Sequence, residues 1–246
     1  KIDGSDKHFE LYCKPDYSPE LLLTQMYLCH FTCFRTREVR AVGGFRPQFD
    51  GAQDFDLALR LLPQLSADNV HHVPRPLYHW RAWAQSTALT IEAKPWAQEA
   101  SARAQQDHLD RMAGGTVVAS SVPGLNEVHP AVPSPPLVSV IIPTAGAAND
   151  QGRLVDAAVA SLREYESSAP LEITAVTTGE IAPIDGVDAQ VVHEPPFNFS
   201  RAINTGRHHS RGEFLFLLND DTLVDSDQPV LRLLEMASDP RVGVIG

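Results

Sequence analysis

The stretch LVSVIIP, residues 137–143, is a continuous apolar run rich in β-branched side chains. Such a run is typical of a strand that is buried on both faces of a parallel sheet. After it, helical and strand-like patterns alternate: a helix at 150–165, strands at 171–176 and 189–194, a helix at 200–212 and a strand at 213–218. This alternation predicts an α/β fold with a doubly wound sheet.

The composition narrows the class of protein. The chain has 246 residues, is 43% hydrophobic and carries a formal net charge of -11, which disfavours a general surface for nucleic acid or anionic membrane. Its three cysteines are too few for a disulfide framework, so we expect a reducing, cytoplasmic location. No apolar run is long enough to span a bilayer, so any peripheral membrane association must come from regions outside this stretch. Neither end reads as a natural terminus, which predicts a fragment.

The chain divides into three predicted parts, residues 1–90, 91–136 and 137–246. In the first, Ser18 and Pro19 indicate a helix start, a Tyr/Phe/Thr/Cys-rich run at 27–34 favours a strand, and Gly43-Gly44 favours a turn. A helix is expected at 53–62, with short strands at 70–74 and 76–80. In the middle part, we expect a helix at 95–112 and an extended, proline-rich linker at 122–136.

Polar residues follow the strand at 213–218. Asn219, Asp220 and Asp221 would lie at its carboxyl end, where open α/β sheets bind ligands. Adjacent carboxylates repel each other, and a bound Mg²⁺ or Mn²⁺ that also contacts phosphates would relieve that repulsion. Taken alone, the same residues are explained equally well by a polar turn that caps the next helix.

Three segments of the last part, residues 136–144, 195–224 and 242–246, resemble the nucleotide-sugar half of a family 2 glycosyltransferase with the GT-A fold. That fold is a doubly wound, mixed sheet. The resemblance implies a metal site in which Asp221 matches the last Asp of the family's Asp-x-Asp motif and Asn219 replaces the first. It also implies these nucleotide-binding positions: Pro143, Thr144, Thr177, Asn204, Gly206 and Asp220. Thr177 and Thr178 stand where the family has a base-reading Asp, which is a departure from the pattern.

Residues 14–61 and 71–81 resemble the acceptor half of the same family. The resemblance implies that Asp54 is the general base, with Gln53 and Asp56 beside it in the substrate site. An inverting transfer needs such a carboxylate to remove the proton of the acceptor hydroxyl. Both aspartates could instead be acids favoured by the helix dipole in a first turn.

The segment 76–81 supplies further predicted contacts. By the same resemblance, His79 is an auxiliary metal ligand. The aromatic face of Trp80 would suit an acceptor sugar, and the donor fork of Arg81 would suit the diphosphate. Structural packing is the alternative for each of these side chains.

These observations predict a metal-dependent, inverting glycosyltransferase that uses a nucleotide-sugar donor. Its acceptor would be a glycan or lipid-linked glycan in surface polysaccharide biosynthesis. Because the acceptor-like half comes first, the chain is either a slice across two tandem modules, with two incomplete and inactive halves, or one permuted domain. The remaining alternatives are a degenerate glycan-binding or scaffolding module and, less well supported, a nucleotidyltransferase.

Overall fold

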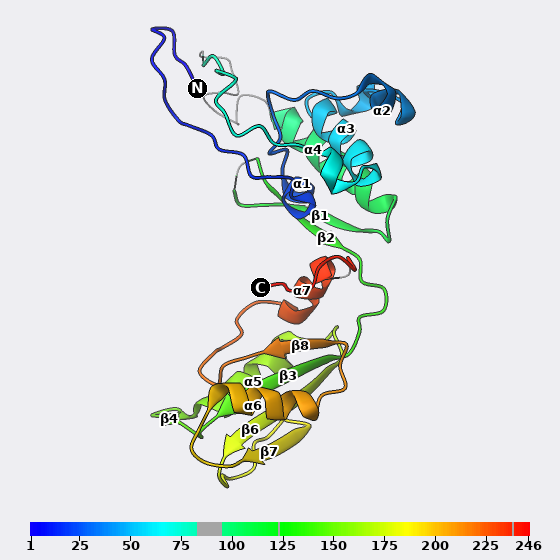
Figure 1. The fold of residues 1–246 in the computed structure, drawn as a ribbon. Coiled ribbons are helices and arrows are strands. Elements are labelled where there is room, and N and C mark those ends of the chain that lie inside the picture. The colour runs from blue at the N-terminus through cyan, green and yellow to red at the C-terminus, as the bar shows by residue number, and fades with distance from the viewer. Residues whose placement is uncertain (83–94, 123, 238) are drawn as a thin grey trace. The chain divides into compact units, whose positions relative to one another are not determined.

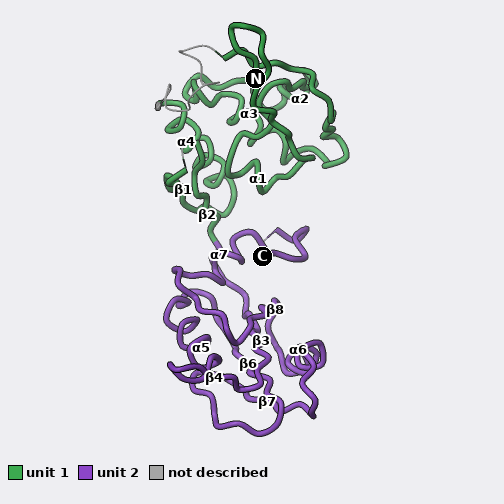
Figure 2. Tube along the Cα trace, turned by 90° about the vertical axis from the view of Figure 1, so that its left-hand side faces the viewer, with its two compact units in different colours: residues 1–131 green, residues 132–246 purple. Residues whose placement is uncertain are grey.

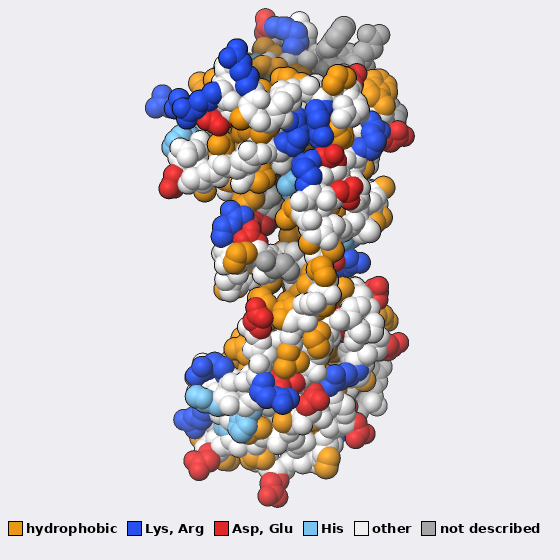
Figure 3. All heavy atoms as spheres, turned by 90° about the vertical axis from the view of Figure 1, so that its right-hand side faces the viewer, with side chains coloured by type: hydrophobic (Ala, Val, Ile, Leu, Met, Phe, Trp, Pro, Cys, Tyr) orange, Lys and Arg blue, Asp and Glu red, His pale blue; other side chains and the backbone are white. Residues whose placement is uncertain are grey.

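The computed structural model describes residues 1–82, 95–122, 124–237 and 239–246. The chain forms two compact units, Lys1–Ala131 and Val132–Gly246, called unit 1 and unit 2 below (Figure 2). On the face that Figure 3 shows, cationic and anionic side chains are interspersed over both units, with no continuous basic surface among the residues drawn in colour. No helix within the described ranges is long and apolar enough to cross a membrane.

Unit 2 is built on a four-stranded parallel sheet with the order β7-β6-β3-β8 (Figure 1). The strands are β3 (Val138–Thr144), β6 (Leu171–Thr178), β7 (Ala189–His193) and β8 (Phe214–Leu217). Every residue of the central strand β3 is buried, which confirms the strand predicted from its apolar run. All four strands are parallel, so the described part of this sheet differs from the mixed sheet that the resemblance implied.

Helices cover both faces of this sheet. Val140 and Ile142 point to one face, where they pack with α5 (Leu154–Tyr165) and α7 (Pro229–Ala237). Ile141 points to the opposite face, as alternation along a strand requires, and packs against α6 (Phe199–His208). The doubly wound architecture is therefore confirmed. A short hairpin, β4 (Ala148–Asn149) and β5 (Gly152–Arg153), replaces the beginning of the helix expected at 150–165.

Two buried glutamates fasten the elements of unit 2. Glu172 accepts hydrogen bonds from the Ser139 hydroxyl and from the backbone and side chain of Arg211. Although burial opposes it, these donors lower the pKa of the Glu172 carboxyl to about 2. Glu166, just after α5, accepts from the backbone N–H groups of Val230 and Leu231 at 2.8 and 3.0 Å, and so caps the start of α7.

Unit 1 combines helices with a two-stranded sheet, which is described below. Its helices are α1 (Pro19–Thr24), α2 (Thr36–Ala41), α3 (Gln53–Leu61), α4 (Pro95–Asp110) and three 3-10 helices at Pro47–Phe49, Leu62–Gln64 and Ala67–Asn69. The Ser18 side chain caps α1, as predicted. The core gathers apolar residues of α1, α3 and α4 around Leu22, Leu57 and Ala104.

Several predictions for the first 136 residues are wrong. The run at 27–34 contains no strand, and neither do 70–74 and 76–80; the nearest pairing is an isolated bridge between Ile2 and Arg81. The expected linker contains β2 (Asn126–Pro130), which pairs antiparallel with β1 (Gly115–Ala119). The helix α4 packs on α3 within unit 1, so the structure divides the chain after residue 131. The boundary expected at 90/91 lies outside the described residues.

Candidate functional site

The residues after β8 lie at the reversal point of the strand order in unit 2. The chain passes from β3 through α5 to β6 on one side, whereas β8 pairs with β3 on the other side. In open α/β sheets, the crevice that binds ligands lies outside the carboxyl ends of the strands at such a point. Thr144 ends β3, and Asn219 to Asp221 follow β8, so both groups of residues border this crevice.

One hydrogen bond joins the two strand ends. The buried Thr144 hydroxyl donates to Oδ2 of Asp220 at 2.6 Å and accepts from the backbone N–H of Gly146 at 3.0 Å. The Gly146 N–H group donates to a lone pair of the Thr144 hydroxyl oxygen, so the hydroxyl proton is directed at the Asp220 carboxylate. Thr144 therefore fixes the orientation of the half-buried Asp220 side chain.

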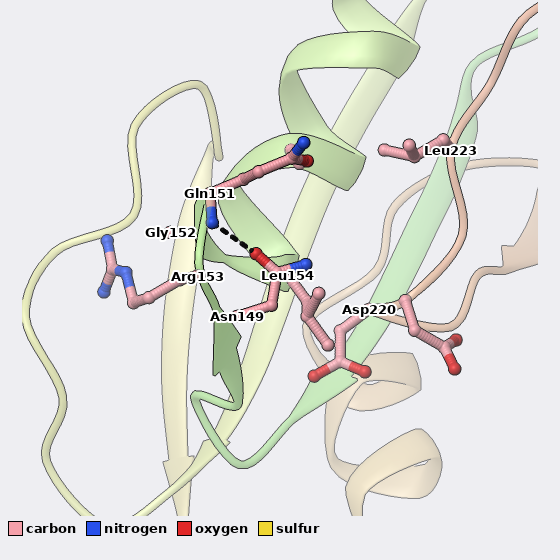
Figure 4. Close-up of a pocket in the computed structure, with 9 residues that line it drawn as sticks. Asn149, Gln151, Gly152, Arg153, Leu154, Asp220 and Leu223 are labelled. Carbon is pink, nitrogen blue, oxygen red and sulfur yellow. Dashed lines mark hydrogen bonds between the residues drawn. The ribbon is translucent and has the colours of Figure 1, made fainter.

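A small cavity of about 150 Å³ lies beside this pair (Figure 4). It is lined by Asn149, Gln151, Gly152, Arg153, Leu154, Ala157, Asp220, Asp221 and Leu223. The Asn149 side chain accepts from the Gln151 N–H at 2.8 Å and closes the β4–β5 hairpin, while the Arg153 guanidinium points away from Asp220. Arg153 is held there by Asp156 and by the carbonyl groups of Ala182 and Pro183.

The hairpin residues that line this cavity were missed by sequence reasoning, which assigned 150–165 to one helix. The signal that could have found them is the run Asn149-Asp150-Gln151-Gly152, because Asn, Asp and Gly are the residues that favour tight turns.

The acidic residues at the crevice fit a divalent cation that is shared with a ligand. Asp220 and Asp221 supply carboxylate oxygens side by side, and Mg²⁺ or Mn²⁺ in nucleotide sites needs only one or two protein carboxylates besides phosphate oxygens. Throughout the described ranges, no group of three or more His, Cys, Asp or Glu side chains gathers to form a complete protein cage. Asn219 is exposed, and its carbonyl accepts the Thr222 N–H in a turn.

The predicted nucleotide-binding residues divide into two groups. Thr144 and Asp220 touch, and Pro143 precedes them on the buried strand. Thr177 on β6 pairs in register with Thr144 on β3, and both residues are buried. The Thr177 hydroxyl donates to the carbonyl of Gly179. The Thr177 hydroxyl is therefore already hydrogen-bonded to the backbone of its own loop.

On α6, Asn204 is exposed, whereas Gly206 is buried against the sheet. A Cβ atom on Gly206 would lie 2.5 Å from Cγ2 of Ile141 and 3.2 Å from Cγ2 of Val176. Gly206 therefore has a packing role, because it allows the helix to approach β3 closely.

A larger cavity, of about 500 Å³, lies in unit 1. Its lining includes Gln53 and Asp54 at the start of α3, together with Met26, Cys29, His30, Phe31, Thr32, Phe34, Phe45 and Tyr78. Asp54 is half-buried, and its Oδ1 accepts the Phe55 N–H at 2.9 Å.

Asp56 is not among the residues that line this cavity; its side chain lies in a cluster of ion pairs. Its carboxylate is 1% exposed and pairs with Arg46 and Arg60. Burial by itself would raise the pKa of this carboxyl, but the two guanidinium groups outweigh burial and lower it. Arg60 also donates to the carbonyl groups of Val42 and Gly44, so Asp56 stabilises the turn before Phe45. Asp56 was expected in the substrate site, whereas its carboxylate is enclosed by the two arginines.

Three predicted residues of segment 76–81 also have protein partners. The ring of His79 stacks on His8, with centroids 4.5 Å apart, and Trp80 lies 5.5 Å from the ring of His30. Arg81 is exposed, 3.7 Å from the Asp6 carboxylate. His79 belongs to unit 1, whereas Asn219 and Asp221 belong to unit 2. From this segment it is Tyr78 that lines the cavity, and sequence reasoning missed it.

No family model matches the chain. It is 34% identical over 254 residues to the uncharacterized protein y4gI of Sinorhizobium fredii, an alignment that covers 98% of this chain and 27% of that protein. It is 32% identical over 254 residues to the O-antigen biosynthesis protein RfbC of Myxococcus xanthus, covering 100% of this chain and 20% of that protein. The chain thus spans about a quarter or less of the curated relatives that it matches.

Among solved structures, a mannosyltransferase from Pyrobaculum calidifontis, in complex with GDP-Man and Mn²⁺, matches with 19% identity and a TM-score of 0.37. That match covers 65% of this chain and 45% of the mannosyltransferase chain. A match at this level bears on neither reaction nor ligands. The comparisons therefore relate the whole chain to a much longer protein that is named for O-antigen biosynthesis.

Proposed function

We propose that this chain is part of a metal-dependent, inverting glycosyltransferase of GT-A type that builds a surface polysaccharide from a nucleotide-sugar donor. The observation that carries the proposal is the Thr144–Asp220 hydrogen bond at the reversal point of the sheet, where open α/β sheets bind ligands. The name of the Myxococcus xanthus relative, O-antigen biosynthesis protein, supports the polysaccharide product.

In this proposal unit 2 binds the donor. Thr144 holds the Asp220 carboxylate toward the crevice, and Asp221 adds a second carboxylate next to it. Asp220 and Asp221 would hold a Mn²⁺ or Mg²⁺ ion, which when bound would supply positive charge for the leaving diphosphate. The nucleoside lies against the carboxyl ends of β3 and β6, near Pro143 and Thr144.

Unit 1 supplies the acceptor site. Asp54 is the general base and takes the proton of the acceptor hydroxyl while that oxygen attacks the anomeric carbon. Its carboxylate is half-buried and lines a cavity, so a ligand bound in that cavity can reach it. Gln53 lies next to Asp54 and stabilises the turn before α3, because its Oε1 accepts the Gly51 N–H at 2.9 Å.

We assign the two units to consecutive modules, with unit 1 as the acceptor half of one and unit 2 as the donor half of the next. Both curated relatives align with essentially the whole chain in this order and are far longer than it, which supports a slice of a tandem enzyme. The alternative arrangement is a single permuted domain, in which both units serve the same site.

Titration calorimetry of the chain with UDP and GDP, with and without Mn²⁺, tests the donor site. We expect binding that requires Mn²⁺ and is lost in Asp220→Asn/Asp221→Asn. Metal-independent binding, or none in a parent protein extended at both ends, would contradict the donor site and favour the rival function, a degenerate glycan-binding module. That rival is supported by the Thr177 hydroxyl, which is already engaged with the Gly179 carbonyl.

Sugar transfer by the extended parent protein tests the base and the arrangement together. Asp54→Asn should lower the rate of one transfer by about 10²–10⁴-fold, because general-base catalysis contributes that much. In a tandem enzyme Asp220→Asn impairs a different transfer step, whereas in a permuted domain both substitutions abolish the same step. Unchanged transfer in Asp54→Asn would exclude it as the base.

A further inference from the structure

The cavity of unit 1 has an aromatic wall. Phe31, Phe45 and Tyr78 line it from three separate segments and remain 72%, 59% and 44% exposed. Large aromatic side chains stabilise a fold mainly through the area they bury, so leaving three of them open at one cavity forfeits stabilisation. Exposed apolar surface that is concentrated at a concave site marks a place where a ligand binds.

The wall is held in place by specific contacts. The Phe31 and Tyr78 rings are nearly parallel, with an interplanar angle of 5° and centroids 6.3 Å apart. Lys14 donates from Nζ to the carbonyl of His30 at 2.7 Å, and the Thr32 hydroxyl donates to the Cys29 carbonyl at 2.7 Å. These bonds on either side of Phe31 fix its loop.

The other two rings are also anchored. Phe45 follows the turn at Gly43-Gly44, where Arg60, itself paired with Asp56, donates to the Gly44 carbonyl at 2.7 Å. Tyr78 stacks on His30, with ring centroids 5.4 Å apart. The aromatic wall is therefore preorganised by the fold, which lowers the entropy cost of binding a ligand against it.

The polar side chains of the cavity include neither Lys nor Arg. They include the carboxylate of Asp54, the amide of Gln53, the hydroxyl groups of Thr32 and Tyr78, and the imidazole of His30. Phosphate groups are bound by cationic forks, by helix N-terminal N–H groups or by metals. The N-terminus of α3 is at this cavity, but the carboxylate of Asp54 occupies its first turn and repels the charge of a nucleoside diphosphate. A neutral ligand with hydroxyl groups therefore fits the cavity better.

We infer that this cavity binds the pyranose ring of a neutral saccharide, with an apolar face of the ring stacked on Phe31, the most exposed ring of the aromatic wall, which Tyr78 supports by stacking on it. The C–H groups on one face of a pyranose carry partial positive charge and complement the negative faces of aromatic rings. Its hydroxyl groups then meet Asp54 and Gln53. The inference deepens the proposed function, because it names the acceptor as a sugar recognised by stacking.

Saturation-transfer NMR on the full chain tests the inference, with methyl glycosides of glucose, galactose and mannose as separate probes. We expect transfer from protein aromatic protons to the C–H protons of one sugar face for at least one glycoside. Phe31→Ala/Tyr78→Ala should weaken that binding on the order of tenfold, since aromatic contacts contribute about that factor. Phe31 is exposed, so circular dichroism should show an unchanged fold.

The matched control is Phe199→Ala, which removes a comparably exposed ring from unit 2 and should leave saccharide binding unchanged. Absence of transfer to all three glycosides in the folded wild-type chain would overturn the inference, as would equal binding by Phe31→Ala/Tyr78→Ala. Binding of UDP or GDP that these substitutions abolish would also overturn it, by making the cavity a nucleotide site.

The two proposals can fail separately. If the glycoside binds through the aromatic wall but the extended protein transfers no sugar, unit 1 is a saccharide-binding module and the proposed function fails alone. If transfer depends on Asp54 but is unaffected by Phe31→Ala/Tyr78→Ala at limiting acceptor, the transferase stands and the stacking inference fails.

Discussion

Unit 2 and unit 1 are stabilised in different ways. Unit 2 is layered, with a parallel sheet between α6 on one face and α5 and α7 on the other, and apolar side chains fill both interfaces. In unit 1 the long loops around the cavity are fixed by polar contacts, above all by the cluster of Arg46, Asp56 and Arg60. The difference teaches that the strand-end residues of unit 2 are positioned by regular structure, whereas the loops around the cavity of unit 1 are positioned by ion pairs to helices.

The largest expected effect is the loss of the buried charge in unit 1. Asp56→Asn leaves Arg60, whose side chain is 9% exposed, without its anion, whereas Arg46 keeps its ion pair with Asp107. We therefore expect unit 1 to lose about 3 kcal/mol in free energy of unfolding. Hydrogen exchange, which reports each unit separately, should show faster exchange in unit 1 alone. The exposed Asp68→Asn is the control. If Asp56→Asn left exchange unchanged, the contrast between the units would not hold.

Glu172 tests whether unit 2 also depends on a charge. Its folded pKa of about 2 lies below the usual 4.5, so its contribution is fully present above pH 4.5 and is lost as the pH falls toward 2. That loss amounts to about 3 kcal/mol of unfolding free energy. In Glu172→Gln this part of the pH dependence should vanish, as urea unfolding at pH 6 and pH 3 would measure. An unaltered pH slope in the variant would show that other carboxyls dominate.

Gly206 tests the close approach of α6 to the sheet. In Gly206→Ala the new Cβ meets Cγ2 of the buried Ile141, and we expect a net loss of about 1–3 kcal/mol in unit 2, since overpacking outweighs the gain in helix propensity. Thermal unfolding measures it. The control is Asn204→Ala on the exposed side of the same helix, which should not destabilise the fold. A more stable Gly206→Ala would mean that the interface adjusts easily.

The smallest expected effect concerns the start of α1. Ser18→Ala removes the side chain that accepts the Leu21 N–H, and should cost about 1 kcal/mol of unit 1 stability. Urea denaturation of the wild type and of Ser18→Ala, monitored by the hydrogen exchange of amides in unit 1, measures this difference in stability. Ser18→Asp, which keeps a capping oxygen, should restore it; if it does not, the cap is not what stabilises this helix.

Sequence alone determined those features that depend on neighbours along the chain. The apolar run at 137–143, the alternation of strands and helices after it, the Ser18 cap and the turn at Gly43-Gly44 were all predictable, because periodicity and turn chemistry are local properties. The positions of Asp54 in a cavity and of Asp220 at a strand end agree with the sites expected for them, but their catalytic and metal-binding roles stay predictions.

Only the tertiary structure decided which side chains of distant segments meet. The packing of Gly206 against Ile141 and the aromatic wall of Phe31, Phe45 and Tyr78 depend on contacts between residues far apart in the sequence. A carboxylate in a first helical turn has the same local pattern whether it faces a cavity, as Asp54 does, or an ion-pair cluster, as Asp56 does. The two differ by which face of α3 they occupy, and the packing of that helix against the rest of unit 1 determines what each face meets.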